Sequence, residues 1–427
     1  MSDPIPAGGP RPTAPGERHL FFDLLRGAAL LGIALVNVQL MSVPYEIAHG
    51  ELRLWTDPLN TSVQGVVRFL FESTAFALFS LLFGAGFQRL MQRRAEHPGA
   101  GLGTYGRRIA ALAVLGIAHV VLLWFGDVLL LYAGGGVVLL AFRKCRERTL
   151  WAWAGGCLVL PLVALSGFAA LWQGAMAADA QGSAEAWIEA YNAAAWESGQ
   201  AYIEAYRHGT FGEIVSARLS EYGFALWTLP FFGPQIFAAM LIGVALERRG
   251  VLAEPERHGR FFQRMFWMAL PVAVVGKGIY AATLNDIGVI PDAGAFASIA
   301  GAVWGGMAMA LVYVGATRVV RVRGWAPRLV AHVAAAGRMA LTHYLAQSLI
   351  ATTLFFSYGL GWYGRINTWQ AVALMIAVYG LQIGVSTWWF RRFTYGPLEA
   401  LVRRFSYGRS RPPVAPPPLP SPMPPCA

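Results

Sequence analysis

Long apolar stretches recur along the chain and are separated by short polar segments. Most of them hold about 20 residues with few charges, which is the length at which an α-helix crosses the hydrocarbon core of a bilayer. They lack the weak apolar–polar alternation that is typical of a membrane β-barrel. The pattern predicts an all-α, polytopic membrane protein with about ten spanning helices, at 21–43, 66–88, 108–125, 128–142, 150–173, 223–246, 261–284, 293–316, 329–357 and 368–390.

The composition agrees with this fold class. The chain has 427 residues, of which 56% are hydrophobic and 13% are charged, whereas soluble domains carry about 25% charged residues. Of the 34 Lys and Arg residues, 26 fall on one side if the N-terminus is cytoplasmic. Because basic loops stay on the cytoplasmic side, we predict both termini there. The net charge of +11 therefore reflects topology and does not predict nucleic-acid binding.

The chain is expected to form one membrane domain with two tails. We predict a cytoplasmic N-terminal tail at 1–19, a single transmembrane helical domain at 20–410 and a disordered Pro-rich tail at 411–427. The long outer segment at 174–222 has the pattern of an amphipathic helix. It is either an interfacial helix or a lid that contacts substrate. The three cysteines are too scattered to predict a metal site.

The first span, "FFDLLRGAALLGIALVNVQL", carries polar residues along one face. Asp23 and Arg26 are three positions apart near its cytoplasmic end, and Asn37 lies three turns further on the same stripe, roughly 16 Å nearer the outer surface. Polar groups inside a membrane are costly and are therefore functional-site hypotheses. The alternatives are that Asp23 and Arg26 only neutralise each other and that Asn37 only joins two helices.

A second polar group lies in "GIAHVVLLWFGDVLLLYAGGG". His119 and Asp127 flank a tight turn at Gly126, on the outer side of the membrane. Asp127 has two interpretations: it caps the helix that follows it, or it tunes His119 as an acid–base group. His119 itself is either a catalytic base or a buried neutral histidine that donates to a carbonyl.

Three further intramembrane residues are predicted to bind substrate or cofactor. Arg338 and His343 lie in "GRMALTHYLAQSLI", and Lys277 lies in "VVGKGIYAA". Lys277 needs a partner or a water-filled cavity, which the sequence does not name. The segment "LFGAGF" at 82–87 lacks the Lys-Ser/Thr of a phosphate loop, and its small residues favour close packing of helices.

Several segments together resemble the YeiB-like family of bacterial inner-membrane proteins, over about residues 20–408. The segments are "DLLRGAALLGIALVNVQ", "LFSLLFGAGFQRLMQRR", "GIAHVVLLWFGDVLLLYA", "AYRHGTFGEIVSAR", "GRMALTHYLAQSLI" and "WWFRRFTYGPLEALVRRFSYG". The opening pattern DxxRG…N is also similar to the first span of heparan-alpha-glucosaminide N-acetyltransferase and, more distantly, to other transmembrane acyltransferases.

This second resemblance implies a reaction and two of its residues. Such enzymes pass an acyl group from cytoplasmic acyl-CoA to a sugar across the membrane, with an Asn on the first span and a His shortly after it. Asn37 matches the Asn, and His49 lies one position beyond the place of the His. His119 and Asp127 are the alternative acid–base pair, indicated by their placement alone.

Two function classes follow. The first is an acyltransferase that takes acetyl-CoA or another acyl-CoA at the Arg-rich side and acylates a glycan or lipid-linked acceptor, with Asn37 steadying the oxyanion. The second is a transporter or flippase that uses the same polar residues as a pathway. A scaffold whose polar groups only fix helix pairing is a third, plainer alternative. The sequence leaves the acyl donor, the acceptor and the oligomeric state open, a homodimer included.

Overall fold

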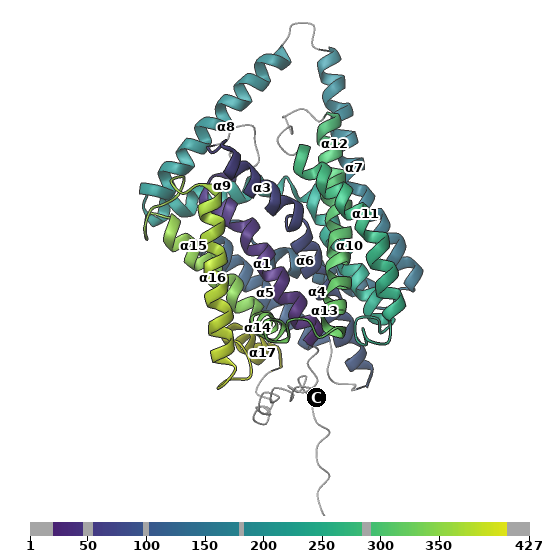
Figure 1. The fold of residues 1–427 in the computed structure, drawn as a ribbon. Coiled ribbons are helices and arrows are strands. Elements are labelled where there is room, and N and C mark those ends of the chain that lie inside the picture. Colours follow the sequence, from purple (N-terminus) through teal and green to yellow (C-terminus); the bar gives the residue numbers. More distant parts are fainter. Residues whose placement is uncertain (1–19, 46–53, 97–101, 179–182, 284–291, 408–427) are drawn as a thin grey trace, which may run out of the picture.

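The computed structural model is a bundle of long helices (Figure 1). It describes residues 20–45, 54–96, 102–178, 183–283 and 292–407, and no strand occurs among them. The predicted tails at 1–19 and 411–427 and the candidate His49 lie outside the described residues.

The helices follow the apolar stretches of the sequence. In chain order they are α1 (Leu20–Ser42), α3 (Pro58–Leu70), α4 (Thr74–Glu96), α5 (Leu102–Leu122), α6 (Leu129–Leu139), η2 (Leu140–Phe142), α7 (Glu147–Ala178), α8 (Ser183–His208), α9 (Phe211–Leu226), α10 (Leu229–Arg248), α11 (Gly259–Thr283), α12 (Ala293–Ala300), η4 (Gly301–Gly305), α13 (Gly306–Val322), α14 (Pro327–Arg338), α15 (Ala340–Phe355), α16 (Thr368–Trp389) and α17 (Pro397–Tyr407).

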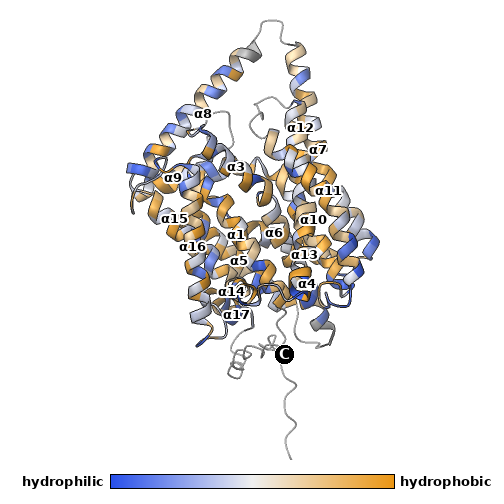
Figure 2. Cartoon of the chain, viewed as in Figure 1, coloured by the Kyte–Doolittle hydropathy of each residue, from blue (hydrophilic) through white to orange (hydrophobic). Residues whose placement is uncertain are grey.

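The structure confirms an all-α, multi-pass membrane protein. Eight of the predicted spans are present as helices long and apolar enough to cross a bilayer, and the predicted span at 128–142 is present as a shorter apolar helix, Leu129–Phe142. Hydrophobic residues cover most of the bundle (Figure 2). Helices of this length and apolar character require a lipid bilayer around them.

The bundle has two distinct ends. At one end α7 and α8 project as two long arms beyond the other helices (Figure 1); α7 has 32 residues and is roughly 48 Å long, which exceeds the ~30 Å hydrocarbon core. We call this the arch end. The opposite end carries α14 and α17 and is called the arginine-rich end, because the loops that the charge pattern assigns to the cytoplasm lie there.

The outer segment 174–222 contains more than one helix. Its first residues continue α7, and the rest divides into α8 and α9. Thr210 starts α9 through a capping box, in which its side chain accepts a bond from the Glu213 N–H and Glu213 bonds back to the Thr210 N–H. The predicted helical character is therefore correct, but the chain turns between Gly209 and Thr210.

The predicted continuous span at 329–357 is divided in two. α14 ends at Arg338, Met339 leaves the helical conformation, and α15 begins at Ala340. The break is stabilised from another part of the chain, because Glu399 of α17 accepts bonds from the N–H groups of Leu341 (2.8 Å) and Thr342 (3.1 Å). These N–H groups have no partner within α15, and Glu399 satisfies them.

Replacing Glu399 by Ala is expected to destabilise the protein. The change leaves two backbone N–H groups of α15 without their carboxylate partner, and the loss of such a helix cap costs roughly 1–2 kcal/mol. Thermal denaturation in detergent micelles measures the effect, and Glu399→Gln, which keeps one acceptor oxygen, should lose less. An unchanged midpoint for the Ala variant would contradict the capping role.

Candidate functional site

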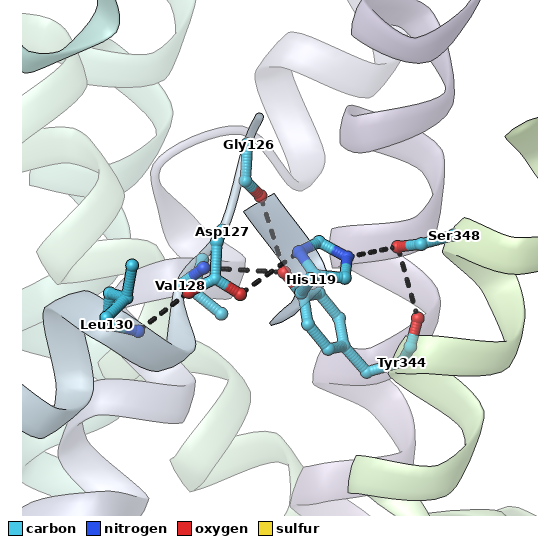
Figure 3. A network of polar contacts seen from close by, with 7 residues as sticks. All are labelled: His119, Gly126, Asp127, Val128, Leu130, Tyr344 and Ser348. Atoms are coloured by element: carbon cyan, nitrogen blue, oxygen red, sulfur yellow. Dashed lines mark hydrogen bonds and ion pairs between the residues drawn. The ribbon is translucent and has the colours of Figure 1, made fainter. Parts of the chain in front are cut away.

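His119, Asp127 and Ser348 come together inside the bundle, near the turn that joins α5 to α6 (Figure 3). His119 Nε2 lies 2.8 Å from Ser348 Oγ, and His119 Nδ1 lies 3.1 Å from Asp127 Oδ2. A carboxylate, an imidazole and a hydroxyl therefore follow one another in a line. This is the order of groups that activates a serine nucleophile.

Asp127 serves two groups at once. Its Oδ1 accepts a bond from the Leu130 N–H at 2.7 Å, so it caps the start of α6, while its Oδ2 faces His119. The latter contact is close but lacks the alignment of a hydrogen bond. The capping role of Asp127 is thus present in the structure, and its other oxygen lies beside the imidazole. That Asp127 tunes His119 as an acid–base group stays a prediction.

Tyr344 and Trp124 hold the imidazole in place. The Tyr344 ring lies 5.2 Å from His119, and its hydroxyl donates to the Gly126 carbonyl at 3.3 Å and accepts from the Val128 N–H at 3.4 Å. Trp124 stands edge-on to His119 at 6.4 Å. Because Tyr344 ties α15 to the turn, it also fixes the distance from Ser348, one helical turn along, to His119.

Ser348 was not among the predicted site residues. It lies in "GRMALTHYLAQSLI", where the ionisable Arg338 and His343 are the stronger indications of a functional site. The signal that could have found it is the four-residue spacing of Tyr344 and Ser348, which places two hydroxyls on one face of an apolar helix. That signal is weak, because single hydroxyls often bond to their own helix.

The site is closed to solvent in this structure. The side chains of His119 and Asp127 have no exposed surface, and α9 packs against α5, the helix that carries His119. Arg218 of α9 is fully buried and donates to the carbonyl of Val121, two residues after His119. Glu221 of the same helix accepts bonds from the Tyr206 hydroxyl (2.5 Å) and the Tyr45 N–H (3.2 Å). These bonds hold α9 against the α5 end of the site, and the lid role considered for the outer segment stays a prediction.

Asn37 is buried in the same layer. It is 4% exposed, and its amide makes no hydrogen bond within the described part of the chain. Val36 and Val38 belong to the same buried apolar cluster as Trp124, and α1 packs against α15, which carries Ser348. Asn37 thus remains available to a ligand that enters this layer.

The other predicted binding residues lie apart from this site. Each has its own partner: Arg26 pairs with Asp23 (3.1 Å), Arg338 lies over the Phe390 ring (3.7 Å), His343 Nε2 lies 2.5 Å from Ser386 Oγ, and Lys277 donates to the carbonyl of Glu72 (2.7 Å). The pairing of Asp23 with Arg26 agrees with the plainer alternative considered for them. Their predicted role in binding substrate stays a prediction.

The chain is similar to several proteins over nearly its full length. A family model described as "Protein of unknown function (DUF418)" matches residues 246–409. The chain is 30% identical to "Uncharacterized protein YeiB" of Escherichia coli (strain K12), over 93% of this chain and 99% of the relative. It is 29% identical to "Uncharacterized protein YxaH" of Bacillus subtilis (strain 168), over 93% and 96% of the two chains. No solved structure matches the chain.

Proposed function

The chain belongs to the YeiB-like family of multi-pass membrane proteins, and from that premise we propose that it is an acyltransferase of the bacterial inner membrane. It takes an acyl group from cytoplasmic acyl-CoA, such as acetyl-CoA, and passes it to a glycan or lipid-linked acceptor that arrives from the arch end. The observation that carries this proposal is the line of Ser348, His119 and Asp127 inside the membrane domain.

The first half of the reaction loads Ser348. As Ser348 Oγ forms a bond to the thioester carbonyl carbon, its proton passes to His119 Nε2, 2.8 Å away. The carbon–sulfur bond then breaks, and His119 returns the proton to the departing thiolate of coenzyme A. Asp127 stabilises the imidazolium that exists between these two proton transfers.

The second half transfers the acyl group to the acceptor. The acceptor hydroxyl or amine gives its proton to His119 as it bonds to the acyl carbon, and the ester bond to Ser348 breaks, so that the serine oxygen takes the proton back. A covalent relay suits two substrates that reach the site from opposite sides, because they need not be present together. We assign to the buried amide of Asn37, which has no hydrogen bond within the described residues, the donation of a hydrogen bond to the oxyanion formed in each half.

In this scheme the closed interior protects the acyl-serine from water. An acyl-serine is lost to hydrolysis if water reaches it, and α9 shields the site from the arch end. The acceptor enters when α9 moves away from the turn at Gly126. The structure then represents the closed state.

The direct test is capture of the acyl-enzyme. Protein in nanodiscs is incubated with labelled acetyl-CoA, denatured, and digested for mass spectrometry. We expect one acetyl group, released by hydroxylamine, on the peptide that contains Ser348. Labelled acetate serves as the control and should leave the protein unlabelled. Absence of any acetylated Ser348 during turnover would remove the covalent mechanism.

The broken helices favour transport as a second candidate function. Ser73 has a positive φ of 57° where α3 ends and α4 begins, and η4 interrupts the α12–α13 span with a turn of π-helix. Interrupted spans of this kind often surround substrate sites in transporters. In that case, substitutions at His119 would change uptake or export by vesicles without any acylated product.

A further inference from the structure

One arginine of α9 is buried with some of its hydrogen-bond donors unused. Arg218 ends the segment "AYRHGTFGEIVSAR" and has no exposed surface. Its Nη1 donates to the carbonyl of Val121, and its guanidinium lies 5.7 Å from the centre of the Phe356 ring. Its Nε and Nη2 are buried without a hydrogen-bond partner, and the described residues supply no ion pair to it.

The two unused nitrogens lie on the same edge of the guanidinium. Their N–H groups point side by side, which matches the two oxygens of a carboxylate or two oxygens of a phosphate. This pairing occurs elsewhere in the molecule, because Nε and Nη2 of Arg89 hold the two carboxylate oxygens of Glu247 at 2.6 and 3.3 Å. At Arg207 the same edge is occupied by the carbonyl of Tyr363, at 3.1 and 2.9 Å. Arg218 differs from both because its edge has no acceptor.

The plainer alternative is that Arg218 only fastens α9 to α5. A neutral side-chain amide could make the same bond to the Val121 carbonyl, whereas a guanidinium brings further N–H groups that are costly to bury without acceptors. The carboxylate of Glu221, one turn later on α9, accepts bonds from the Tyr206 hydroxyl (2.5 Å) and the Tyr45 N–H (3.2 Å). It leaves the free edge of Arg218 unfilled. An anion bound at this edge removes the cost.

Arg218 lies next to the candidate functional site, toward the arch end (Figure 1). Val121, whose carbonyl it bonds, follows His119 by two residues, a rise of roughly 3 Å along α5. Trp124 stands edge-on to His119 at 6.4 Å and belongs to the same buried cluster as Phe356. Its indole Nε1 is also buried without a partner. A guanidinium edge and an indole N–H are therefore both unused in the layer beside His119.

A single helix separates Arg218 from the outside of the molecule. The buried residues of α9 lie on one face, and they are Ile214, Ala217, Arg218 and Glu221. The exposed residues of its central turns lie between them, and they are Ser216, Leu219, Ser220 and Gly223. α9 is not among the helices long and apolar enough to cross a bilayer. An outward movement of α9 therefore opens this layer to an acceptor without displacing a membrane span, and Arg218 moves with the helix.

We propose that Nε and Nη2 of Arg218 bind an anionic group of the acceptor, a carboxylate or a phosphate, and that this bond holds α9 closed beside His119. The inference rests on the proposed acyl transfer and names the class of acceptor, which is a glycan or lipid-linked compound that carries a negative charge. The bound anion accepts two parallel hydrogen bonds and so stabilises the closed state. A neutral acceptor leaves the edge empty and gives no such stabilisation.

The experiment measures hydrogen–deuterium exchange of the α9 amides in dodecyl maltoside micelles, without acetyl-CoA. Dodecyl glucuronide supplies a carboxylate, dodecyl phosphate supplies a phosphate, and dodecyl glucoside is the neutral counterpart of the glucuronide. We expect at least about tenfold slower exchange in α9, saturable with concentration, for a charged compound and no change for the glucoside. A response to one charged compound identifies the anion, and a response to both shows that Arg218 accepts either. Equal exchange with all three compounds overturns the proposal.

Two variants assign the response to the edge of Arg218. Arg218→Lys keeps the positive charge and a donor for the Val121 carbonyl but lacks the pair of parallel N–H groups. It should weaken binding of the charged compound by at least about tenfold while the denaturation midpoint stays close to that of the unmodified protein. Arg365→Gln removes an exposed charge at the arch end, and it is the matched control that should leave binding unchanged. Unchanged binding by a folded Arg218→Lys variant contradicts the proposal.

The comparison of charged and neutral compounds on the unmodified protein decides the matter even if Arg218→Lys does not fold. It is also separate from the test of acyl transfer, because no acyl donor is present. If α9 responds to an anion but Ser348 is never acetylated, acyl transfer fails and the anion site stands. If Ser348 is acetylated but no anion slows exchange in α9, the inference about Arg218 alone fails.

Discussion

Replacing Ser348 by Ala is expected to lower the turnover of acyl transfer at least about a thousandfold, as removal of a serine nucleophile does in enzymes with this arrangement. The variant loses the oxygen that carries the acyl group, while His119 and Asp127 keep their positions because Tyr344 and the Leu130 N–H still hold them. The measurement is release of free coenzyme A together with labelled acceptor, at saturating acetyl-CoA.

Ser386→Ala is the matched control for this experiment. Ser386 is also fully buried and lies 2.5 Å from a histidine, His343, but no carboxylate lies within 4 Å of that histidine in the described residues. It therefore lacks the third group of the Ser348 site, and its loss should change turnover by no more than a few fold. Equal losses for both variants would show that any buried Ser–His bond matters only for folding.

Much of the fold follows from the sequence because its cause is local. The length and apolar character of each span are set by its own residues, and so the helices at 21–43 and 368–390 were predicted nearly to their ends. The break at Met339 was not predicted, because the carboxylate that stabilises it belongs to Glu399, about 60 positions later. A continuous helix was the expectation although Gly337 lies two positions before the break, because a single Gly is tolerated within a helix.

The candidate site, like the fold, was predictable only where its arrangement depends on residues close together in the sequence. His119 and Asp127 are joined by a tight turn, so their proximity follows from chain connectivity. The approach of Ser348 depends on how α15 packs against α5, and the two residues that meet are 229 positions apart. Lys277 was expected to need a partner, but the partner is a backbone carbonyl at a helix break, which no residue type reveals.

Replacing Gly84 by Leu is expected to prevent correct assembly of α4 on α10. A Cβ atom at Gly84 would lie 1.9 Å from the backbone oxygen of Met240, and one at Gly243 would lie 2.0 Å from that of Leu81. The two backbones therefore touch, and a side chain must push the helices apart through a fully buried layer. Overpacking costs about 1–3 kcal/mol of stability where side chains can adjust. A larger loss of stability is expected here because the added side chain clashes with backbone atoms, which cannot move aside as side chains do.

Gly86 of the same segment provides the control, since a Cβ there has nothing within 4 Å. Gly86→Leu adds the same side chain to the same helix, two positions away, and should leave the protein monodisperse on size-exclusion chromatography with an unchanged denaturation midpoint. Gly84→Leu should appear as aggregate or fail to accumulate in the membrane. If both variants behave alike, the close approach of α4 and α10 is wrong, and with it the packing of both helices against α6, which follows Asp127.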